Sequence, residues 1–187
     1  MNSVDWDKRY REGFYNGTID PHPLLQKFWH MIPKGNVADI AMGMGRNSLF
    51  LAERGYRAWG LDRSSEALKI AKETARAGVC EMSLILGDAN TLPFRHGSMT
   101  GVIVFYFLLR EIMTEMVDLL QSGGVIIYET FLKRQNVIDR RRNPEFLLDD
   151  GELISWFADL DLIFYEETIS EVRGKVRAIA RYVGRKR

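Results

Sequence analysis

The sequence predicts an α/β fold: a doubly wound, mostly parallel seven-stranded sheet with an antiparallel hairpin at its C-terminal end. Short apolar runs alternate with stretches of helical spacing over most of the chain, which is typical of strands joined by crossover helices. Near the end, two strand-like runs flank the turn Arg173-Gly174-Lys175. Because right-handed crossovers make successive strands parallel, only this hairpin is expected to be antiparallel.

The first half of the chain alternates strand and helix. Asn47–Arg54 has helical spacing and stops at Gly55, and a second helix is capped by Ser64 or Ser65 and stops at Gly78. Both helices are preceded and followed by short apolar runs that end at glycine or aspartate. These runs predict strands at 37–42, 57–62 and 82–86.

The second half continues the same alternation. Gly101–Leu109 is the most apolar run and predicts a central strand buried on both faces. A polar and basic segment at 132–149 has no strong period. The other elements expected here are a helix at 111–120 ended by a turn at 122–124, a strand at 125–131, a helix at 150–160, and strands at 161–169 and 176–183.

Length and composition favour one globular domain. The 187 residues, 46% of them hydrophobic, suffice for one core, with 1–33 expected as an N-terminal helical cover and 34–187 as the main domain. A formal net charge of +1 argues against nucleic acid as a partner. A single cysteine, a charged N-terminus without a signal peptide and no membrane-length apolar run predict a cytoplasmic protein outside the membrane.

The stretch from Val37 to Asp62 carries the strongest functional signal. Gly43 and Gly45 follow the first predicted strand, where small residues let the backbone approach a ligand closely. The helix that follows offers free N–H groups. Asp62 closes the next strand, where a carboxylate can accept two hydrogen bonds from a ribose diol. The pattern predicts a ligand that contains a nucleoside.

The spacing argues against two common nucleotide classes. A dinucleotide fingerprint requires a third glycine, and Ser48 occupies that position, so a nucleotide-dependent oxidoreductase is disfavoured. No glycine-rich lysine loop is present, which disfavours a nucleoside triphosphate. A nucleoside without phosphates remains.

These residues resemble the class I S-adenosylmethionine-dependent methyltransferases. The acid, small residue and Gly-x-Gly of that family's first motif match Asp39, Ala41, Gly43 and Gly45, although many relatives have glycine in place of Ala41. The resemblance is closest to the tellurite-resistance-like group, whose motif continues as Gly-Arg-Asn-Ser. Further similar segments are WDKRY (6–10), GDANTLPF (87–94), SGGVIIYETF (122–131) and NPEFLLDDGEL (143–153).

The resemblance implies a Rossmann-like fold, S-adenosyl-L-methionine as cofactor and methyl transfer to a small-molecule acceptor. Asp62 would bind the ribose, Arg63 would lie beside the adenine, and Asp88 and Ala89 would bind the adenine. The methionine part would be surrounded by Asp39, Ala41, the 43–45 backbone, Arg46 and Asn47, with Tyr10 folding over it. Phe105 and Tyr106 would line the space near the sulfonium.

Each of these roles has a structural alternative. Asp62 could cap the next helix, Asp88 could form a turn, and Tyr10 could be a packing residue. The three histidines have no metal-like spacing, so no metal is expected.

A basic cluster follows the fifth predicted strand. It comprises Lys133, Arg134, Arg140, Arg141 and Arg142, opposed within the run only by Asp139. It is either a solvated loop or a lid that attracts an anionic acceptor.

The sequence leaves the acceptor and the oligomeric state open. Arg110 and Glu129 could position a substrate or form structural salt bridges, and no compelling general base is evident. By resemblance, the acceptor would be an anionic compound or a thiol. The alternative function is a non-catalytic S-adenosylmethionine-binding regulator.

Overall fold

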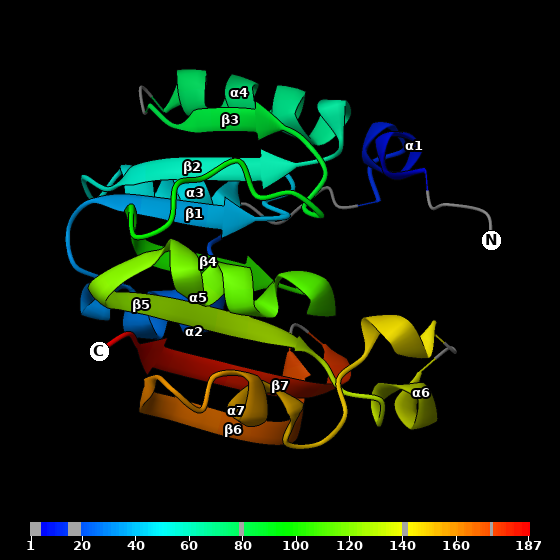
Figure 1. Cartoon of the computed structure of the whole chain (residues 1–187). Helices are drawn as coiled ribbons and strands as arrows, with labels where there is room; N and C mark the ends of the chain where they lie inside the picture. Colours follow the sequence, from blue (N-terminus) through cyan, green and yellow to red (C-terminus); the bar gives the residue numbers. More distant parts are fainter. Residues whose placement is uncertain (1–4, 15–19, 79–80, 140–141, 173) are drawn as a thin grey trace.

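The computed structural model describes residues 5–14, 20–78, 81–139, 142–172 and 174–187. Within these ranges, seven strands form one sheet in the order β3-β2-β1-β4-β5-β7-β6 (Figure 1). Strands β1 to β5 pair in parallel, and β7 runs antiparallel to both β5 and β6. The predicted fold is confirmed. The strands are β1 (Asn36–Ile40), β2 (Arg57–Asp62), β3 (Ser83–Leu86), β4 (Met99–Phe105), β5 (Leu120–Phe131), β6 (Asp161–Val172) and β7 (Lys175–Arg185).

Helices cover both faces of this sheet. The helices are α1 (Trp6–Arg11), α2 (Pro23–Phe28), α3 (Arg46–Ala52), α4 (Ser65–Ala77), α5 (Met113–Leu119), α6 (Gln135–Ile138) and α7 (Glu152–Trp156), with 3-10 turns η1 (Trp29–Met31), η2 (Arg110–Ile112) and η3 (Pro144–Phe146). In Figure 1, α2 and α3 lie behind the sheet, and α5 and α7 lie in front. Alternate residues of β1 point to opposite faces. Val37 therefore packs in one cluster with Leu25 and Leu51, and Ile40 packs in another with Met116.

Several predicted boundaries differ from the structure. The strand expected to reach residue 109 ends at Phe105, because Tyr106 has a left-handed φ of 57° that breaks the extended backbone. The helix expected over 150–160 is limited to α7, since the backbone of Phe157 is no longer helical. The turn expected at 122–124 lies within β5, where Gly123 has a positive φ. The 132–149 segment contains α6 and η3.

The N-terminal segment is helical where the structure describes it. Asp5 caps α1 by accepting the Lys8 N–H at 2.9 Å, and His22 caps α2 by accepting the Leu24 N–H on Nδ1 at 3.2 Å. Helix α1 lies beyond the carboxyl ends of the strands, beside α4 (Figure 1). The division of the chain at residue 33 stays a prediction. None of the described helices is long and apolar enough to cross a membrane.

Candidate functional site

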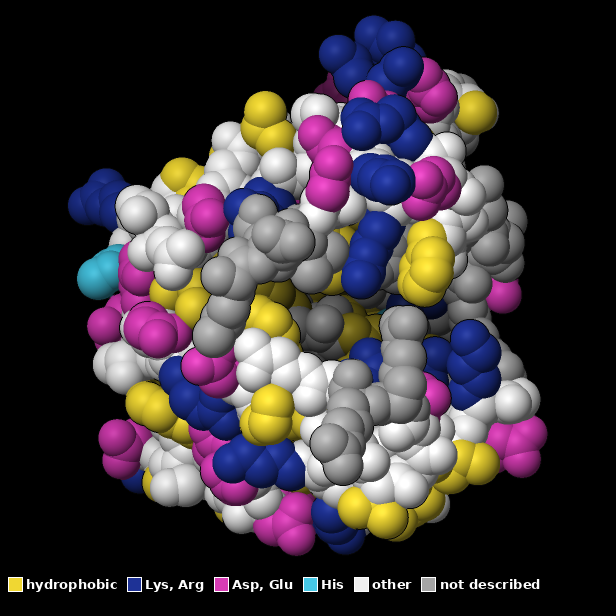
Figure 2. Space-filling view, turned by 90° about the vertical axis from the view of Figure 1, so that its right-hand side faces the viewer, with side chains coloured by type: hydrophobic (Ala, Val, Ile, Leu, Met, Phe, Trp, Pro, Cys, Tyr) yellow, Lys and Arg dark blue, Asp and Glu magenta, His cyan; other side chains and the backbone are white. Residues whose placement is uncertain are grey.

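The carboxyl ends of β1, β2, β4 and β5 meet at one edge of the sheet. Strand β1 pairs with β2 on one side and with β4 on the other, so the strand order reverses at β1. Ligands of doubly wound sheets bind at such a reversal. Figure 2 shows this edge of the molecule hollowed at its centre, with hydrophobic side chains inside and Lys and Arg side chains on the rim.

The loop after β1 requires its glycines. Gly43 and Gly45 have φ angles of 57° and 77°, and Ala41 has a φ of 56°. A Cβ atom at Gly43 would lie 2.8 Å from the hydroxyl oxygen of Tyr10. A Cβ atom at Gly45 would lie 2.7 Å from the methyl carbon of Met42. Tyr10 therefore occupies the space that Gly43 leaves open, and the close approach of this backbone to a ligand stays a prediction.

Asp39 is an acid buried beneath this loop. Only 2% of the residue is exposed, and its Oδ2 accepts a hydrogen bond of 2.8 Å from the Ser48 hydroxyl. Burial, and to a smaller extent the nearby charge of Asp62, raises the pKa of Asp39 to about 7. A positively charged ligand group next to Asp39 would stabilise the ionised form.

Asp62 connects the end of β2 to the glycine loop. Its Oδ2 accepts the Gly43 N–H at 2.8 Å, and its Oδ1 accepts the Ser64 N–H at 2.9 Å. Burial raises the pKa of Asp62, and these hydrogen bonds partly offset that effect. The helix-capping contact itself belongs to Ser64, whose hydroxyl accepts the Ala67 N–H. The ribose role of Asp62 stays a prediction.

The loop that follows β3 has local contacts only. Asp88 is exposed, and its Oδ1 accepts from both the backbone and the side-chain nitrogen of Asn90, at 3.0 Å and 2.7 Å. This is the turn-forming contact weighed as the alternative for Asp88. The Gly87 N–H donates to the Asp62 carbonyl, which keeps this loop next to the end of β2. Arg63 is exposed. The adenine roles of Arg63, Asp88 and Ala89 stay predictions.

The N-terminal segment is attached to the site at two points. Asp7 accepts hydrogen bonds from the Ser64 hydroxyl at 2.6 Å and from the Glu66 N–H at 3.2 Å, which docks α1 on the first turn of α4. Asn47, at the start of α3, accepts the His22 N–H at 2.8 Å. This contact gives the Asn47 side chain a structural partner, and its predicted cofactor role stays a prediction. Arg46 donates to the Asp20 carbonyl at 3.3 Å.

A buried polar network lies at the ends of β4 and β5. The ring of His22 stacks on Phe105, with centroids 4.2 Å apart, and its Nε2 lies 3.2 Å from the Tyr106 hydroxyl and 3.1 Å from Glu129 Oε1. Burial lowers the pKa of His22. Glu129 is 1% exposed, and its Oε2 accepts from Arg181 Nε at 2.9 Å. Burial alone would raise the pKa of Glu129, but the hydrogen bonds from His22 and Arg181 lower it.

Sequence reasoning placed Phe105 and Tyr106 in this region but missed His22. The only signal for His22 was its position between two prolines, which marks a helix start and not a ligand site. The salt-bridge alternative for Glu129 is present, because its oxygens lie 3.1 Å from His22 Nε2 and 2.9 Å from Arg181 Nε. Its substrate-positioning role stays a prediction.

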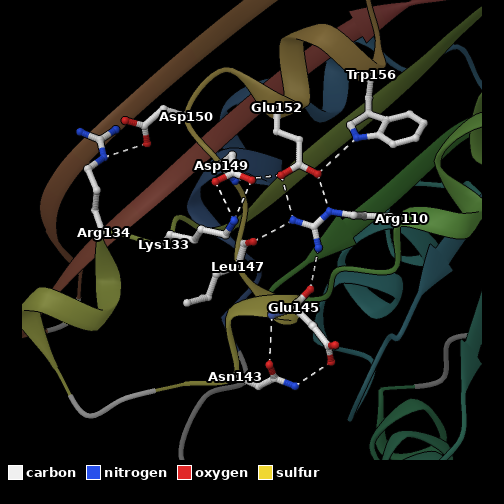
Figure 3. A network of polar contacts seen from close by, with 10 residues as sticks. All are labelled: Arg110, Lys133, Arg134, Asn143, Glu145, Leu147, Asp149, Asp150, Glu152 and Trp156. Atoms are coloured by element: carbon white, nitrogen blue, oxygen red, sulfur yellow. Dashed lines mark hydrogen bonds and ion pairs between the residues drawn. The ribbon is translucent and has the colours of Figure 1, made fainter.

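Arg110 holds the segment that follows α6. Its guanidinium donates to both carboxylate oxygens of Glu152, at 2.6 Å and 2.9 Å, and to the carbonyls of Glu145 and Leu147 (Figure 3). These contacts form the structural salt bridge that the sequence offered as one alternative to a substrate-positioning role. The proposed substrate role of Arg110 stays a prediction.

The local sequence suggested that Asp139 alone opposes the basic cluster, but the structure adds further carboxylate partners. Lys133 pairs with Asp149 at 2.7 Å, and Arg134 pairs with Asp150 at 3.1 Å, because the two ends of the 132–149 loop meet (Figure 3). Arg142 pairs with Asp139 at 3.7 Å, and its guanidinium lies 4.3 Å from the centroid of the Phe131 ring. The other two predicted anion-binding residues, Arg140 and Arg141, lie outside the described residues.

Comparison with known proteins identifies the family. A family model described as a methyltransferase domain matches residues 37–124, which include the glycine loop, Asp39 and Asp62. This match supports a class I S-adenosylmethionine-dependent methyltransferase domain. The predicted resemblance is therefore confirmed.

Individual relatives of this methyltransferase agree. This chain is 24% identical to the probable S-adenosyl-L-methionine-dependent methyltransferase TehB of Haemophilus influenzae over 147 residues. The alignment covers 73% of this chain and 49% of that protein. The chain thus spans about half the length of this curated relative. The crystal structure of TehB from Haemophilus influenzae superimposes with a TM-score of 0.78, at 21% identity over 97% of this chain and 67% of that chain.

A second solved structure carries a cofactor product. Geranyl diphosphate C-methyltransferase from Streptomyces coelicolor, in complex with Mg²⁺, geranyl diphosphate and S-adenosyl-L-homocysteine, matches with a TM-score of 0.68. It is 15% identical and covers 87% of this chain and 76% of that chain. At these identities, the structural matches support the fold. In the described part of this chain, no three His, Cys, Asp or Glu side chains cluster as metal ligands.

Proposed function

We propose that the protein transfers a methyl group from S-adenosylmethionine to a small-molecule acceptor at the carboxyl ends of β1 and β4. One observation carries the proposal: at the strand-order reversal, Asp62 accepts the Gly43 N–H of the glycine loop, and the buried Asp39 accepts the Ser48 hydroxyl in the helix that follows this loop. This arrangement lies inside the segment that matches the methyltransferase domain.

The residues fit the cofactor that the family implies. Asp39 is a buried acid with a raised pKa, which suits a ligand that brings a positively charged ammonium. The glycine loop leaves room for close backbone approach, and Tyr10 lies over it. Asp62 would hold the ribose, with Arg63, Asp88 and Ala89 at the adenine. S-adenosylmethionine supplies a methyl group already activated by its sulfonium.

The chain then has to position the acceptor and exclude water. Holding two reactants in line is worth roughly 7–11 kcal/mol of the barrier. Strand β4 pairs with β1, so Phe105 at its end and Tyr106 directly after it lie beside the glycine loop. These two side chains would contact an acceptor bound next to the cofactor. The N-terminal segment, attached through Asp7 and His22, provides a cover.

We propose an acceptor that is small and either anionic or a thiol. A small acceptor suits a site bordered by short segments, namely the N-terminal cover and the 132–149 loop. The near-neutral net charge disfavours nucleic acid. We also propose a cytoplasmic location, because the single cysteine suits a reducing compartment.

A non-catalytic S-adenosylmethionine-binding regulator is the second candidate. The observation that favours it is the absence of an evident general base: among the described strand-end residues, Glu129 has a lowered pKa and is paired with Arg181. Fold cannot decide between an enzyme and a binding protein. Turnover with any acceptor does.

The deciding experiment is a screen for S-adenosylhomocysteine release. Purified protein would be mixed with S-adenosylmethionine and with thiols, metalloid oxyanions or small carboxylates in turn. Release above the acceptor-free rate supports the enzyme. Tight cofactor binding without release in every acceptor class favours the regulator.

A further inference from the structure

A cavity lies at the edge of the sheet opposite the candidate site. Its volume is about 220 Å³, and it is located at the amino ends of the parallel strands, where Asn36 begins β1 and Met99 begins β4. Its lining includes Asn36, Trp59, Ile85, Phe94, Arg95 and Met99. None of these residues belongs to the candidate site.

The cavity exists because no helix covers this part of the sheet. Ile85 of β3 packs with the cluster that contains Met116 of α5, and Trp59 of β2 is on the same face, since its register partner Ser83 lies two residues before Ile85. The connection from β3 to β4, residues 87–98, is fully described and contains no helix. In Figure 1 it crosses in front of β2 and β1 as an extended trace. The sheet face beneath it is therefore only partly covered.

The walls of the cavity suit an aromatic ligand. Trp59 and Phe94 contribute partly exposed rings, and Ile85 and Met99 contribute aliphatic surface. An apolar cavity of about 150 Å³ binds benzene, so this one has room for one ring with a small substituent. The indole Nε1–H of Trp59 is buried without an acceptor among the described residues. Because buried N–H groups nearly always have a partner, the chain alone does not complete the packing around this ring.

The rim of the cavity offers hydrogen-bond donors. Arg95 is exposed and forms no ion pair with a described residue. Asn36 Nδ2 donates one of its two hydrogens to the Ser98 carbonyl at 3.2 Å, which leaves the second hydrogen for another acceptor. Asn36 Oδ1 accepts from Arg57 Nε at 2.8 Å, so a second guanidinium lies beside the rim. No described aspartate or glutamate lines the cavity, and the rim therefore favours an anion.

We infer that this cavity binds a small aromatic carboxylate, with the ring against Trp59 and Phe94 and the carboxylate at Arg95 and the Asn36 amide. A guanidinium presents a fork of N–H donors that matches a carboxylate, and the amide adds one more donor. Trp59 precedes Asp62 by three residues of β2, which is about 10 Å. The ligand is thus separate from the cofactor, and this site does not depend on the proposed function.

The probe for this site is 4-fluorobenzoate, and 4-fluorobenzamide is its uncharged counterpart. Binding to the full chain would be followed through the indole N–H signals of the four tryptophans, with the Trp59 signal identified by its loss in Trp59→Phe. We expect 4-fluorobenzoate to shift the Trp59 signal in a saturable manner. The Trp29 signal should stay in place, because Trp29 packs on the opposite face of the sheet. The acid should bind at least about tenfold more tightly than the amide.

Two matched variants test the carboxylate contact. Arg95→Gln should weaken 4-fluorobenzoate about tenfold, to the level of the amide, with an unchanged Tm because the side chain is exposed. Arg76→Gln is the same change at an exposed position of α4, which packs on the other face of the sheet, and should have no effect. Saturating S-adenosylhomocysteine should not displace the probe.

An unmoved Trp59 signal, equal binding of the acid and the amide, or unchanged binding in Arg95→Gln would overturn this site. Displacement by S-adenosylhomocysteine would overturn it as well, since the probe would then occupy the cofactor site. Failure of S-adenosylhomocysteine to bind, with the Trp59 shift and its loss in Arg95→Gln intact, would contradict the proposed function and support this site.

Discussion

Replacing Asp39 by Asn tests whether the buried acid is the counter-charge for the cofactor. Asparagine has nearly the same shape but cannot ionise. In the ligand-free protein, the pKa of Asp39 is raised to about 7, mainly by burial. A cationic ammonium beside this carboxylate favours the ionised form and lowers the pKa. Binding of the cofactor should therefore expel the proton from Asp39.

The size of the effect follows from that pKa. With a pKa of about 7, Asp39 is half protonated at pH 7 and about nine-tenths protonated at pH 6. Affinity should then rise about fivefold from pH 6 to pH 7, and about tenfold per pH unit below that range, because the ligand-free state holds more protons than the complex. The dependence flattens above pH 7, because Asp39 is then mostly ionised before the ligand binds.

Calorimetry measures both quantities. S-adenosylhomocysteine would be titrated in two buffers of different ionisation enthalpy, which gives the number of protons released. We expect about half a proton at pH 7 and about nine-tenths at pH 6 for the natural protein. Asp39→Asn should show neither the release nor the pH dependence, and weaker binding at pH 7. Equal proton release in the variant would refute the role assigned to Asp39.

Three other perturbations test the site and its support. Asp62→Ala should weaken S-adenosylhomocysteine, by roughly 1.5–3 kcal/mol for each charge-assisted hydrogen bond lost, whereas an unchanged Kd in calorimetry would leave Asp62 only its contacts to Gly43 and Ser64. Gly43→Ala should weaken the same ligand, and Tyr10→Phe should partly rescue it by removing the hydroxyl 2.8 Å from the new Cβ; no rescue would mean that backbone strain dominates. Arg110→Ala should lower the Tm, with Arg110→Lys intermediate; equal Tm values would show that the contacts in Figure 3 add no stability.

The sequence predicted the part of the candidate site in which the ends of successive strands meet. Glycines at 43 and 45 and a carboxylate at 62 mark the ends of two successive strands, and strand ends meet at one edge in a parallel sheet. The parallel pairing of β1 to β5 follows from the same alternation of strands and helices. Boundaries were less predictable, because the strand before Tyr106 ends through a backbone angle that no apolar pattern encodes.

The remaining contacts join residues that are far apart in the chain. Tyr106 lies 84 residues from its partner His22, and Arg110 lies 42 residues from Glu152. A single sequence holds no signal for such pairs, since they depend on how the N-terminal segment and the 132–149 loop fold back.

The central claim is that the strand-end site binds S-adenosylmethionine, and thermal unfolding with and without ligand tests it most directly. A ligand of the native state at about 100 times its Kd stabilises it by about 2.7 kcal/mol, which for a chain of this size raises the Tm by about 5–10 °C. S-adenosylmethionine and S-adenosylhomocysteine should each raise the Tm of the natural protein, and NAD should leave it unchanged. Stabilisation by NAD alone would contradict the account.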